Sequence, residues 1–371
     1  MHRRLLAFVL GMVVVVAAAL GAISLDPERD GARAKVDRTS TTSTAPTTTT
    51  TTRPRRGSLQ PVTFAFGGDV HFESHLRRKL DVDPSGMFAP IAGELSAADV
   101  AMVNLEAAIT EGGTPDPKSY SFRAPARALD ALRVAGVDVV TVANNHGRDY
   151  GPVGLADTLT AKASGALPVV GVGNNAAEAY APWRVEVRGQ RIAVFGASDV
   201  IDDPLRSQWI ATDTQAGIAS AKAPEQERLL AAVRAERPGA DTIAVYLHWG
   251  SEGTDCPTAR QRELARALVD AGADLIVGGH THRVMSAGRL PTTEGNAFVD
   301  YGLGNFVFYN ESGPSGITGV LTVTATGRDV DAYAWKPARI RGGIPTPLTG
   351  DAAATDVAAF DQRRTCTDLT P

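Results

Sequence analysis

The sequence predicts an α/β fold, on the basis of three observations. Short apolar runs of strand length recur along the chain and alternate with stretches of helical periodicity. Runs that are apolar throughout are typical of strands buried on both faces of a sheet. Polar side chains directly follow five of these runs, and ligand sites of open α/β sheets lie beyond the carboxyl ends of the strands. Roughly 310 residues follow a Thr-rich N-terminal segment, which is enough for one large core.

The expected strands are short and rich in β-branched residues. They are Val62–Phe66, Val100–Val103, Val137–Val142, Val169–Val172, Trp183–Val187, Arg191–Phe195, Ile243–Leu247, Leu275–Val277, Ala297–Asp300 and Asn305–Phe308, followed by a hairpin of Ile317–Ala325 and Val330–Trp335. Helical spacing indicates helices over Ala126–Ala135, Pro152–Ser164, Pro224–Glu236 and Thr258–Ala271. Pro257 stands before the last helix and Gly272 after it, as helix ends prefer.

Five short motifs follow apolar runs, and they contain five of the seven histidines. They are Gly68-Asp69-Val70-His71, Asn104-Leu105-Glu106, Asn144-Asn145-His146, His248-Trp249-Gly250 and Gly279-His280-Thr281-His282. Side chains at positions i and i+2 of an extended backbone point to the same side, so each histidine-containing pair of this spacing presents two ligands to one centre. Imidazole together with carboxylate suits Zn, Mn, Fe or Ni better than Ca or Mg. The ordered set therefore predicts a transition-metal site.

The ligand types favour two divalent ions of Mn, Zn or Fe. Glu106 is the only acid of its motif, and its two oxygens can bridge two cations. We expect one metal among Asp69, His71, Glu106 and His282, and a second among Glu106, Asn145, His248 and His280. Such pairs lie roughly 3.5–4 Å apart, activate a water and stabilise an anionic transition state. A single histidine at a strand end is more often a structural residue, so the prediction depends on the whole set.

Four further residues are assigned to the chemistry of the site. His146 faces away from the ligand Asn145 and is assigned to the substrate as an acid or charge stabiliser. Asp149 either orients His146 or caps the helix near Pro152, and capping is the favoured role. Arg123 is expected to hold a substrate carboxylate or phosphate, with an ordinary surface arginine as the alternative. Asn305 is expected to hydrogen-bond near the site, although loop geometry explains it equally well.

The order of these motifs resembles the calcineurin-like metallophosphoesterase superfamily. The residues in and around them are similar to those of the CapA family, which is linked to poly-γ-glutamate capsules. The matching stretches are Phe66-Gly67-Gly68-Asp69, Asn104-Leu105-Glu106, Tyr120-Ser121-Phe122-Arg123-Ala124-Pro125, Asn144 to Gly151, His248 to Glu252, Ala271 to His280 and Gly302 to Phe306. The resemblance implies a four-layer α/β/β/α sandwich of the metallo-dependent phosphatase type. It also implies that the protein binds an anionic envelope polymer or a small anionic substrate, and that membrane proteins of capsule synthesis are its partners.

Two departures from the family pattern bear on activity. His71 completes an Asp-x-His that many CapA-like sequences lack, which favours a complete metal site. Glu106 stands where ordinary phosphoesterases carry Gly-Asp-x-x-Asp, so phosphatase activity does not follow from the resemblance. The function is therefore either a metal-dependent hydrolase of an envelope phosphoester or γ-glutamyl bond, or a non-catalytic factor that binds a polyanion for assembly or export. A wall-associated module with a vestigial site is disfavoured by ligands at all five motifs.

The N-terminus predicts a membrane segment over residues 1–24. Basic residues at positions 2–4 precede an uncharged apolar run from Leu5 to Ile23, which is nearly long enough to span a bilayer. Acidic residues follow it, so the body of the protein is expected outside the cytoplasm. We expect an uncleaved anchor. A cleaved signal peptide at Ala17-Ala18-Ala19, which would release a secreted protein, is the alternative.

The remaining organisation follows from composition. Residues 25–61 are predicted to be a disordered linker, because the Ser/Thr tract from Thr39 to Thr52 buries too little apolar surface to offset its ordering entropy. Residues 62–345 form the expected domain and 346–371 a polar C-terminal tail. The net charge of −4 does not indicate a nucleic-acid-binding protein, because such proteins carry an excess of basic residues.

The chain contains two cysteines, Cys256 and Cys366. Neither fits a metal-ligand spacing such as Cys-x-x-Cys. An extracytoplasmic location allows disulfides to persist. We expect a bridge that holds the tail near the loop after His248, with two free thiols as the alternative.

Overall fold

The computed structural model describes residues 57–292 and 295–371, and two large sheets dominate this part of the chain. The first sheet has the order β18 (Ile344–Pro347), β17 (Asp329–Arg341), β16 (Ile317–Thr326), β1 (Val62–Val70), β2 (Val100–Leu105), β5 (Val139–Thr141) and β6 (Val169–Val170), with β15 (Asn305–Val307) also paired to β1. The second has the order β13 (Ala287–Thr292), β14 (Gly295–Asp300), β12 (Leu275–Gly279), β11 (Thr242–His248), β9 (Gln190–Ser198) and β8 (Trp183–Val187). Two small pairs are β3 (Ala108–Ile109) with β4 (Arg123–Ala124), and β7 (Val172–Gly173) with β10 (Gly217–Ile218).

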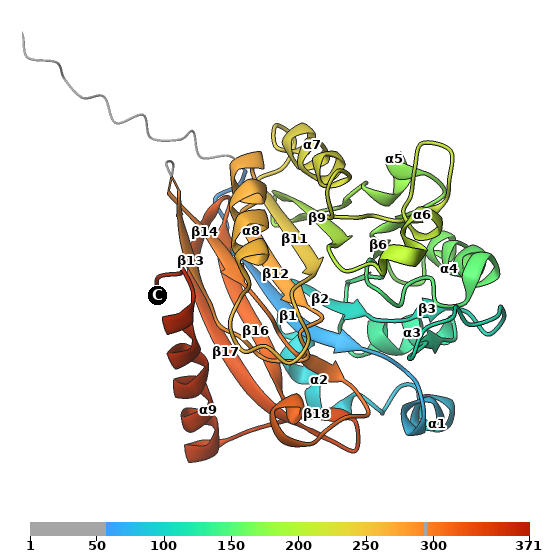
Figure 1. Cartoon of the computed structure of the whole chain (residues 1–371). Coiled ribbons are helices and arrows are strands. Elements are labelled where there is room, and N and C mark those ends of the chain that lie inside the picture. Colours follow the sequence, from blue (N-terminus) through green and yellow to red (C-terminus); the bar gives the residue numbers. More distant parts are fainter. Residues whose placement is uncertain (1–56, 293–294) are drawn as a thin grey trace, which may run out of the picture. The chain divides into compact units, whose positions relative to one another are not determined.

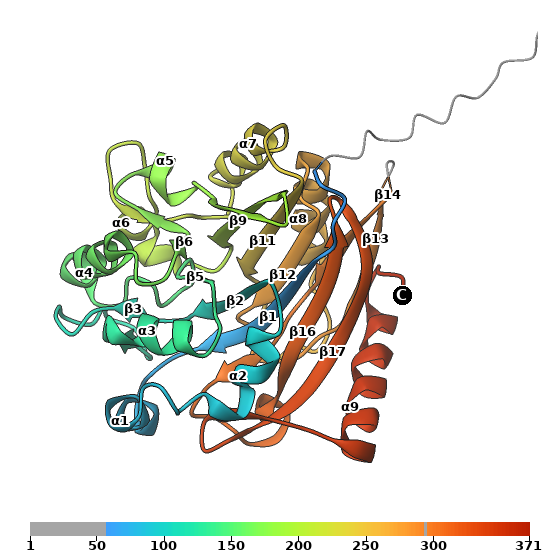
Figure 2. The ribbon, with the colours of Figure 1, turned by 180° about the vertical axis from the view of Figure 1, so that it is seen from behind.

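The two sheets pack face to face around an apolar core. Because side chains alternate along a strand, Phe64 and Phe66 of β1 enter this inner core while Ala65 faces the opposite layer. Val194 of β9 and Val277 of β12 reach the inner core from the second sheet. Figures 1 and 2 show the two sheets from opposite sides.

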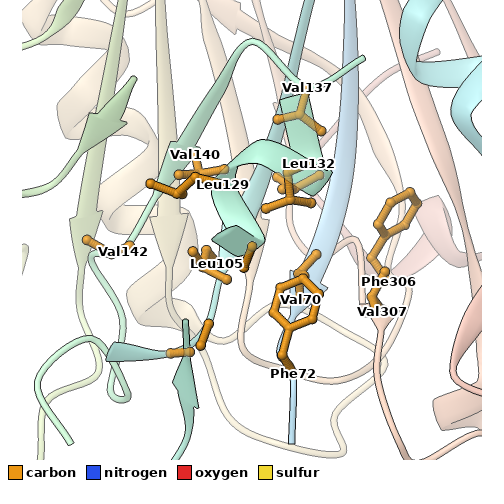
Figure 3. Close-up of a cluster of buried hydrophobic side chains, with 14 of the residues drawn as sticks. Val70, Phe72, Leu105, Leu129, Leu132, Val137, Val140, Val142, Phe306 and Val307 are labelled. Atoms are coloured by element: carbon orange, nitrogen blue, oxygen red, sulfur yellow. The ribbon is translucent and has the colours of Figure 1, made fainter. Parts of the chain in front are cut away.

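Most helices cover the outer faces of the two sheets, and the last one contributes Phe360 to the inner core. The helices are α1 (His75–Val82), α2 (Ala89–Ser96), α3 (Arg127–Val134), α4 (Gly151–Ser164), α5 (Ala176–Ala179), α6 (Arg206–Trp209), α7 (Gln226–Glu236), α8 (Ala259–Ala271) and α9 (Gly350–Arg363). Side chains of α1 to α4 pack on the first sheet, and Figure 3 shows part of this cluster, with Leu129 and Leu132 of α3 gathered with Leu105 and Val140. Apolar side chains of α7 and α8 pack on the second sheet. This arrangement confirms the predicted four-layer α/β/β/α sandwich.

Most of the predicted elements are present, with shifted ends. Helix α8 begins with a capping box in which Thr258 accepts from the backbone of Gln261, and it ends at Gly272 with φ 115°. The predicted hairpin is β16 and β17, although β17 extends to Arg341. Strand β13 was not predicted, because Arg289, Pro291 and Thr292 interrupt its apolar pattern.

The C-terminal segment differs from the expected polar tail. Helix α9 packs against β17, where the rings of Trp335 and Phe360 stack with centroids 4.9 Å apart, and Arg339 pairs with the buried Asp356. The helix is Ala-rich and buries few large side chains, so its packing face is not visible as an apolar stripe. Residues 346–371 therefore belong to the folded body and are not a free tail.

The predicted disulfide joins Cys256 and Cys366, whose Cα atoms lie 5.8 Å apart. It ties the end of the chain to the loop between β11 and α8, as expected. Within residues 57–292 and 295–371, no helix is long and apolar enough to cross a membrane. The predicted anchor and most of the predicted linker lie among residues 1–56, outside the described part of the chain.

Candidate metal centre

The carboxyl ends of the central strands bring the predicted motifs together. Strands β1 and β2 run parallel with Asp69 opposite Asn104, and β11 and β12 run parallel with His248 opposite Gly279. The first pair belongs to one sheet and the second to the other. Polar side chains that directly follow these strands therefore meet where the two sheets end.

Two groups of side chains in the described structure have the composition of a metal site. The first consists of Glu106, His248 and His280, and the second of Asp69, Glu106 and His282. Within each group the ligand atoms lie within 4.8 Å of one another. Glu106 belongs to both groups, which is the bridging position predicted for it.

Asn145 extends the first group. Its Oδ1 lies 2.7 Å from His248 Nε2, and the same imidazole nitrogen lies 3.5 Å from Glu106 Oε1. The amide oxygen therefore faces the space between Glu106 and His248. All four ligands predicted for the second metal, including His280, meet here.

The charges at this centre fit a cation. Both carboxylate oxygens of Glu106 and the Nδ1 of His280 are buried and have no hydrogen-bond partner among the described residues. Burial first, and then the neighbouring Asp69, raise the pKa of Glu106 well above its ordinary value. Burial lowers the pKa of His280 to about 3, so this ring is neutral and its nitrogen is available as a ligand at neutral pH. A buried acceptor without a partner is costly, and a bound cation would remove that cost.

The backbone around the histidine pair is strained. His280 and His282 adopt φ values of 84° and 53°, a region that non-glycine residues rarely occupy. The N–H of His280 donates to Asp69 Oδ2 at 2.9 Å, which holds the turn against β1. A Cβ at Gly279 would lie 2.4 Å from Asp69 Oδ1, so this approach requires glycine. Strain of this kind is typical of functional sites.

Two asparagines that the sequence analysis left without a role hold the predicted ligands in place. Asn104 Nδ2 donates to Asp69 Oδ1 at 2.8 Å and lies 3.1 Å from His248 Nδ1. Asn144 Nδ2 donates to Asn104 Oδ1 at 2.9 Å, and Asn144 Oδ1 accepts from the N–H of His146. Both are fully buried. Each of them precedes a predicted ligand within its motif, and this position was the sequence feature that could have indicated their role.

His146 and Asp149 form a pair beside the metal groups. His146 Nδ1 donates to Asp149 Oδ2 at 2.5 Å, and His146 Nε2 lies 3.9 Å from Glu106 Oε1. Burial lowers the pKa of His146, while Asp149 acts in the opposite direction. Lys118, which nothing in the sequence singled out, lies 2.9 Å from Asp149 Oδ1 and also donates to the carbonyl of Asn145.

The favoured capping role of Asp149 is wrong. Helix α4 begins at Gly151 without a side-chain cap, and Asp149 Oδ2 instead accepts from His146 and from the N–H of Phe122 at 2.7 Å. The tight turn from His146 to Asp149 directs this carboxylate toward the imidazole. Orientation of His146 was the alternative role.

The structure does not bring His71 into either group. Its Nδ1 and Nε2 face the backbone N–H groups of Glu73 at 3.1 Å and Tyr309 at 3.2 Å, and its ring stacks on Phe122. The register of β1 shifts between Asp69 and Val70. This irregularity breaks the alternation on which the Asp-x-His prediction depended.

The two residues predicted to bind substrate have other partners. The guanidinium of Arg123 lies 4.8 Å from the ring centroid of Tyr150, and Arg123 Nη1 donates to the carbonyl of Glu111 at 3.3 Å. Asn305 lies opposite Asp69 on β15, and its Oδ1 is 2.8 Å from His282 Nδ1. Asn305 therefore lies next to the candidate centre, as predicted, and orients His282 of the second group.

Comparison with known proteins agrees with this geometry. Residues 63–310 match the family described as bacterial capsule synthesis protein PGA_cap. The chain is 28% identical over 320 residues to the capsule biosynthesis protein CapA of Bacillus anthracis, covering 84% of this chain and 73% of the relative. It is 29% identical over 251 residues to the PGA biosynthesis protein CapA of Bacillus subtilis, covering 67% and 63%.

A third relative is the probable polyglutamine synthesis accessory protein of Mycobacterium tuberculosis, which is 31% identical over 195 residues, covering 51% of each chain. The family match contains the ligands from Asp69 to His282 and continues to the end of β15. It confirms the resemblance read from the motifs. The chain belongs to the PGA_cap family of bacterial capsule synthesis proteins.

Proposed function

We propose that this protein is a metal-dependent hydrolase that acts on poly-γ-glutamate, or a similar anionic envelope polymer, during capsule synthesis. The observation that carries the proposal is Glu106, a fully buried carboxylate that is shared by two ligand groups and has no hydrogen-bond partner among the described residues. The names of the Bacillus relatives support the choice of polymer.

Two divalent ions of Mn, Zn or Fe are the proposed cofactors. One would be held by Asp69, Glu106 and His282, and the other by Glu106, Asn145, His248 and His280. When bound, such ions polarise a carbonyl or phosphoryl oxygen and neutralise charge that develops in the transition state. His71 is omitted from this ligand set because both of its ring nitrogens face backbone amides.

His146 is the proposed proton carrier. Its Nδ1–H is held by Asp149, which fixes the tautomer and leaves Nε2 facing the side of Glu106. Since burial lowers its pKa, His146 is neutral at neutral pH and can accept a proton at Nε2 from the attacking water. The C–N bond of the γ-glutamyl amide then breaks, and His146 returns the proton to the leaving amine. Lys118 holds Asp149 from the opposite side.

The proposed location is outside the cytoplasm, tethered to the membrane by the apolar run Leu5–Ile23. The sequence supports this orientation through basic residues before the run and acidic residues after it. Membrane proteins of capsule synthesis are the proposed partners.

The test uses the purified whole chain with metal analysis and two substrate classes, γ-linked oligoglutamates and phosphoesters. We expect His146→Gln to keep its metal content and to lose turnover by roughly 10²- to 10⁴-fold. His75→Gln is the matched control, because His75 begins α1 and belongs to neither metal group. Absence of bound metal in wild-type protein would contradict the proposal, and cleavage of phosphoesters alone would reassign the substrate.

A second candidate function is supported by one observation. Glu106 replaces the Gly-Asp-x-x-Asp of ordinary phosphoesterases, and in this second function the same cations would bind a polyanion for assembly or export without turnover. In that case His146→Gln would retain both metal and capsule formation in cells.

A further inference from the structure

A groove separate from the metal groups opens beside helix α4. Its volume is about 610 Å³, within the range of small-molecule sites. One wall is a face of α4 that includes Leu155, Ala156 and Leu159, and the other includes Gln208, Gln215 and Ala216. None of the residues that line it belongs to the two metal groups.

Arg148 is the charged residue that lines this groove. Only 6% of its surface is exposed, and its Nε and Nη1 have no hydrogen-bond partner among the described residues. The acid that acts on it electrostatically is Asp116, which already accepts from Trp209 Nε1 at 2.9 Å. A buried guanidinium with two unpartnered donors is costly in water-excluded surroundings, and a carboxylate in the groove that accepted from one of them would lower that cost.

The position of Arg148 links the groove to the metal centre. Arg148 lies in the turn between His146 and Asp149, and its carbonyl accepts from the first N–H of α4 at 3.0 Å. One side of this turn therefore presents His146 to the metal groups, and the same turn presents Arg148 to the groove. The N-terminal end of α4 adds a favourable field for an anion.

The opposite wall offers an acceptor for an amide. Gln215 Nε2 donates to the carbonyls of Ser207 at 3.1 Å and Ile210 at 2.9 Å. These bonds fix the side chain and leave its Oε1 without a donor among the described residues. A ligand with a carboxylate, a short apolar stem and an amide N–H matches Arg148, Leu159 and Gln215 in turn.

We propose that this groove is a binding site for a glutamyl unit of an amide-linked polyglutamate chain, with the carboxylate of that unit paired to Arg148. The inference rests on the proposed function for the identity of the polymer. The groove would hold a glutamyl unit of the polymer near the bond that is cleaved at the metal groups. Arg148 would thereby determine specificity for carboxylate-bearing chains.

The experiment measures binding of a γ-linked oligoglutamate of defined length to the whole chain by calorimetry. Metal is removed first and the chelator is dialysed away, so that the metal centre does not contribute to binding. We expect Arg148→Gln to weaken binding by roughly 10- to 100-fold, the usual loss of a charged hydrogen-bond pair. Ala156→Glu, an exposed groove position, should weaken it at least as much by placing a competing carboxylate beside Arg148.

Val153→Glu is the matched control, because Val153 lies on α4, is 55% exposed and does not line the groove. It should change binding by less than about twofold, as expected for a surface substitution. Wild-type affinity in both groove variants would overturn the inference. Equal affinity for free glutamate or inorganic phosphate would also overturn it, because the groove would then recognise any anion.

Failure of the inference and of the proposed function give different results. If the oligomer binds in the groove but is never cleaved by metal-loaded protein, the hydrolase proposal fails and the groove stands. If the oligomer is cleaved and both groove variants cleave it with unchanged KM, the groove is not the subsite.

Discussion

Strand β12 carries buried charged groups at both of its ends, and the two ends satisfy those charges differently. At its start, Asp274 is fully enclosed by partners: Arg237 Nη1 lies 2.5 Å from Oδ2, Arg328 Nε donates to Oδ1 at 2.8 Å, and the N–H of Ile243 donates to Oδ2 at 2.8 Å. Burial raises the pKa of Asp274, and the two arginines oppose that shift.

At the other end, β12 leads into the candidate metal centre. Glu106 and His280 meet there with three buried polar atoms that have no partner among the described residues. Lys118 is the cation that acts on Glu106 electrostatically, while Asp69, Glu252 and Asp149 all raise its pKa further. The centre thus gathers several acids around a carboxylate that pairs with no arginine or lysine of residues 57–292 and 295–371.

This difference separates a structural use of buried charge from a functional one. A charge cluster that only stabilises the fold is complete within the chain, because each unpaired member would cost several kcal/mol. A cluster that binds a cation has unpaired buried polar atoms until the cation is bound. The two ends of one strand therefore respond in opposite ways to removal of their carboxylates.

The largest expected effect is on metal binding, in Glu106→Gln. The amide keeps the shape of the side chain but loses the bridging charge. Loss of a residue that only orients a metal ligand weakens metal binding by roughly 10- to 100-fold. We expect the metal affinity of Glu106→Gln to fall by more than this. At about pH 4.5, where the folded state holds Glu106 protonated, metal-free stability should change by no more than about 1 kcal/mol. Elemental analysis and denaturant melts measure the two quantities, and full metal occupancy in the variant would refute the two-metal assignment.

Asp274→Asn should show the reverse pattern. It leaves Arg237 and Arg328 without their shared carboxylate, and we expect a loss of about 3 kcal/mol of unfolding free energy, reduced from the fully buried case because both arginines are partly exposed. The metal content of the folded variant should equal that of wild type. A loss of metal that exceeds the loss of folded protein would show that the two ends are coupled along β12.

The sequence predicted the buried strands and most residues of the two metal groups because both depend on local patterns, whereas the four-layer arrangement was predicted from the family resemblance. Buried strands are continuous apolar runs, and the residues that follow them must meet at one edge of each sheet. The prediction was weaker where a pattern was interrupted. His71 left the site because β1 shifts register beside it, and α9 was missed because Ala-rich packing leaves no apolar stripe.

Residues whose role depends on distant partners gave no signal. Lys118 reaches Asp149 from a loop that shows no periodicity, and the groove around Arg148 is built from α4 and a segment some sixty residues later. Arg148 lay inside a recognised motif, yet its burial decides its role, and burial of a single loop residue is a property of the assembled fold.

A smaller effect on metal is expected from Asn104→Ala. Asn104 contacts Asp69 and His248, which belong to different metal groups, so its loss should loosen one ligand of each. We expect roughly 10- to 100-fold weaker metal binding, as for other residues that orient ligands. Thr63→Ala is a control on β1, since Thr63 pairs with Asp99 at the opposite end of the strand. Equal metal affinity in Asn104→Ala and wild type would remove Asn104 from the ligand-orienting network.

The smallest expected effect is a pH dependence of the metal-free protein. The pKa of Glu106 is raised in the folded state above its ordinary 4.5, so its contribution to stability is complete below about pH 4.5 and is lost as pH rises through the folded pKa. The pKa of His280 is lowered from 6.5 to about 3, so its contribution is complete above about pH 6.5 and is lost as pH falls toward 3.

In denaturant melts across this range, Glu106→Gln should lose much of the alkaline decline and keep the acidic one. Asp69, Asp274 and Asp300, whose pKa values are also raised by burial, should account for the remaining alkaline decline. Added metal should cancel the alkaline decline in wild type, because it binds the ionised carboxylate. An alkaline decline that is identical in wild type and Glu106→Gln would mean that Glu106 is ionised without cost, and the contrast between the two ends of β12 would then disappear.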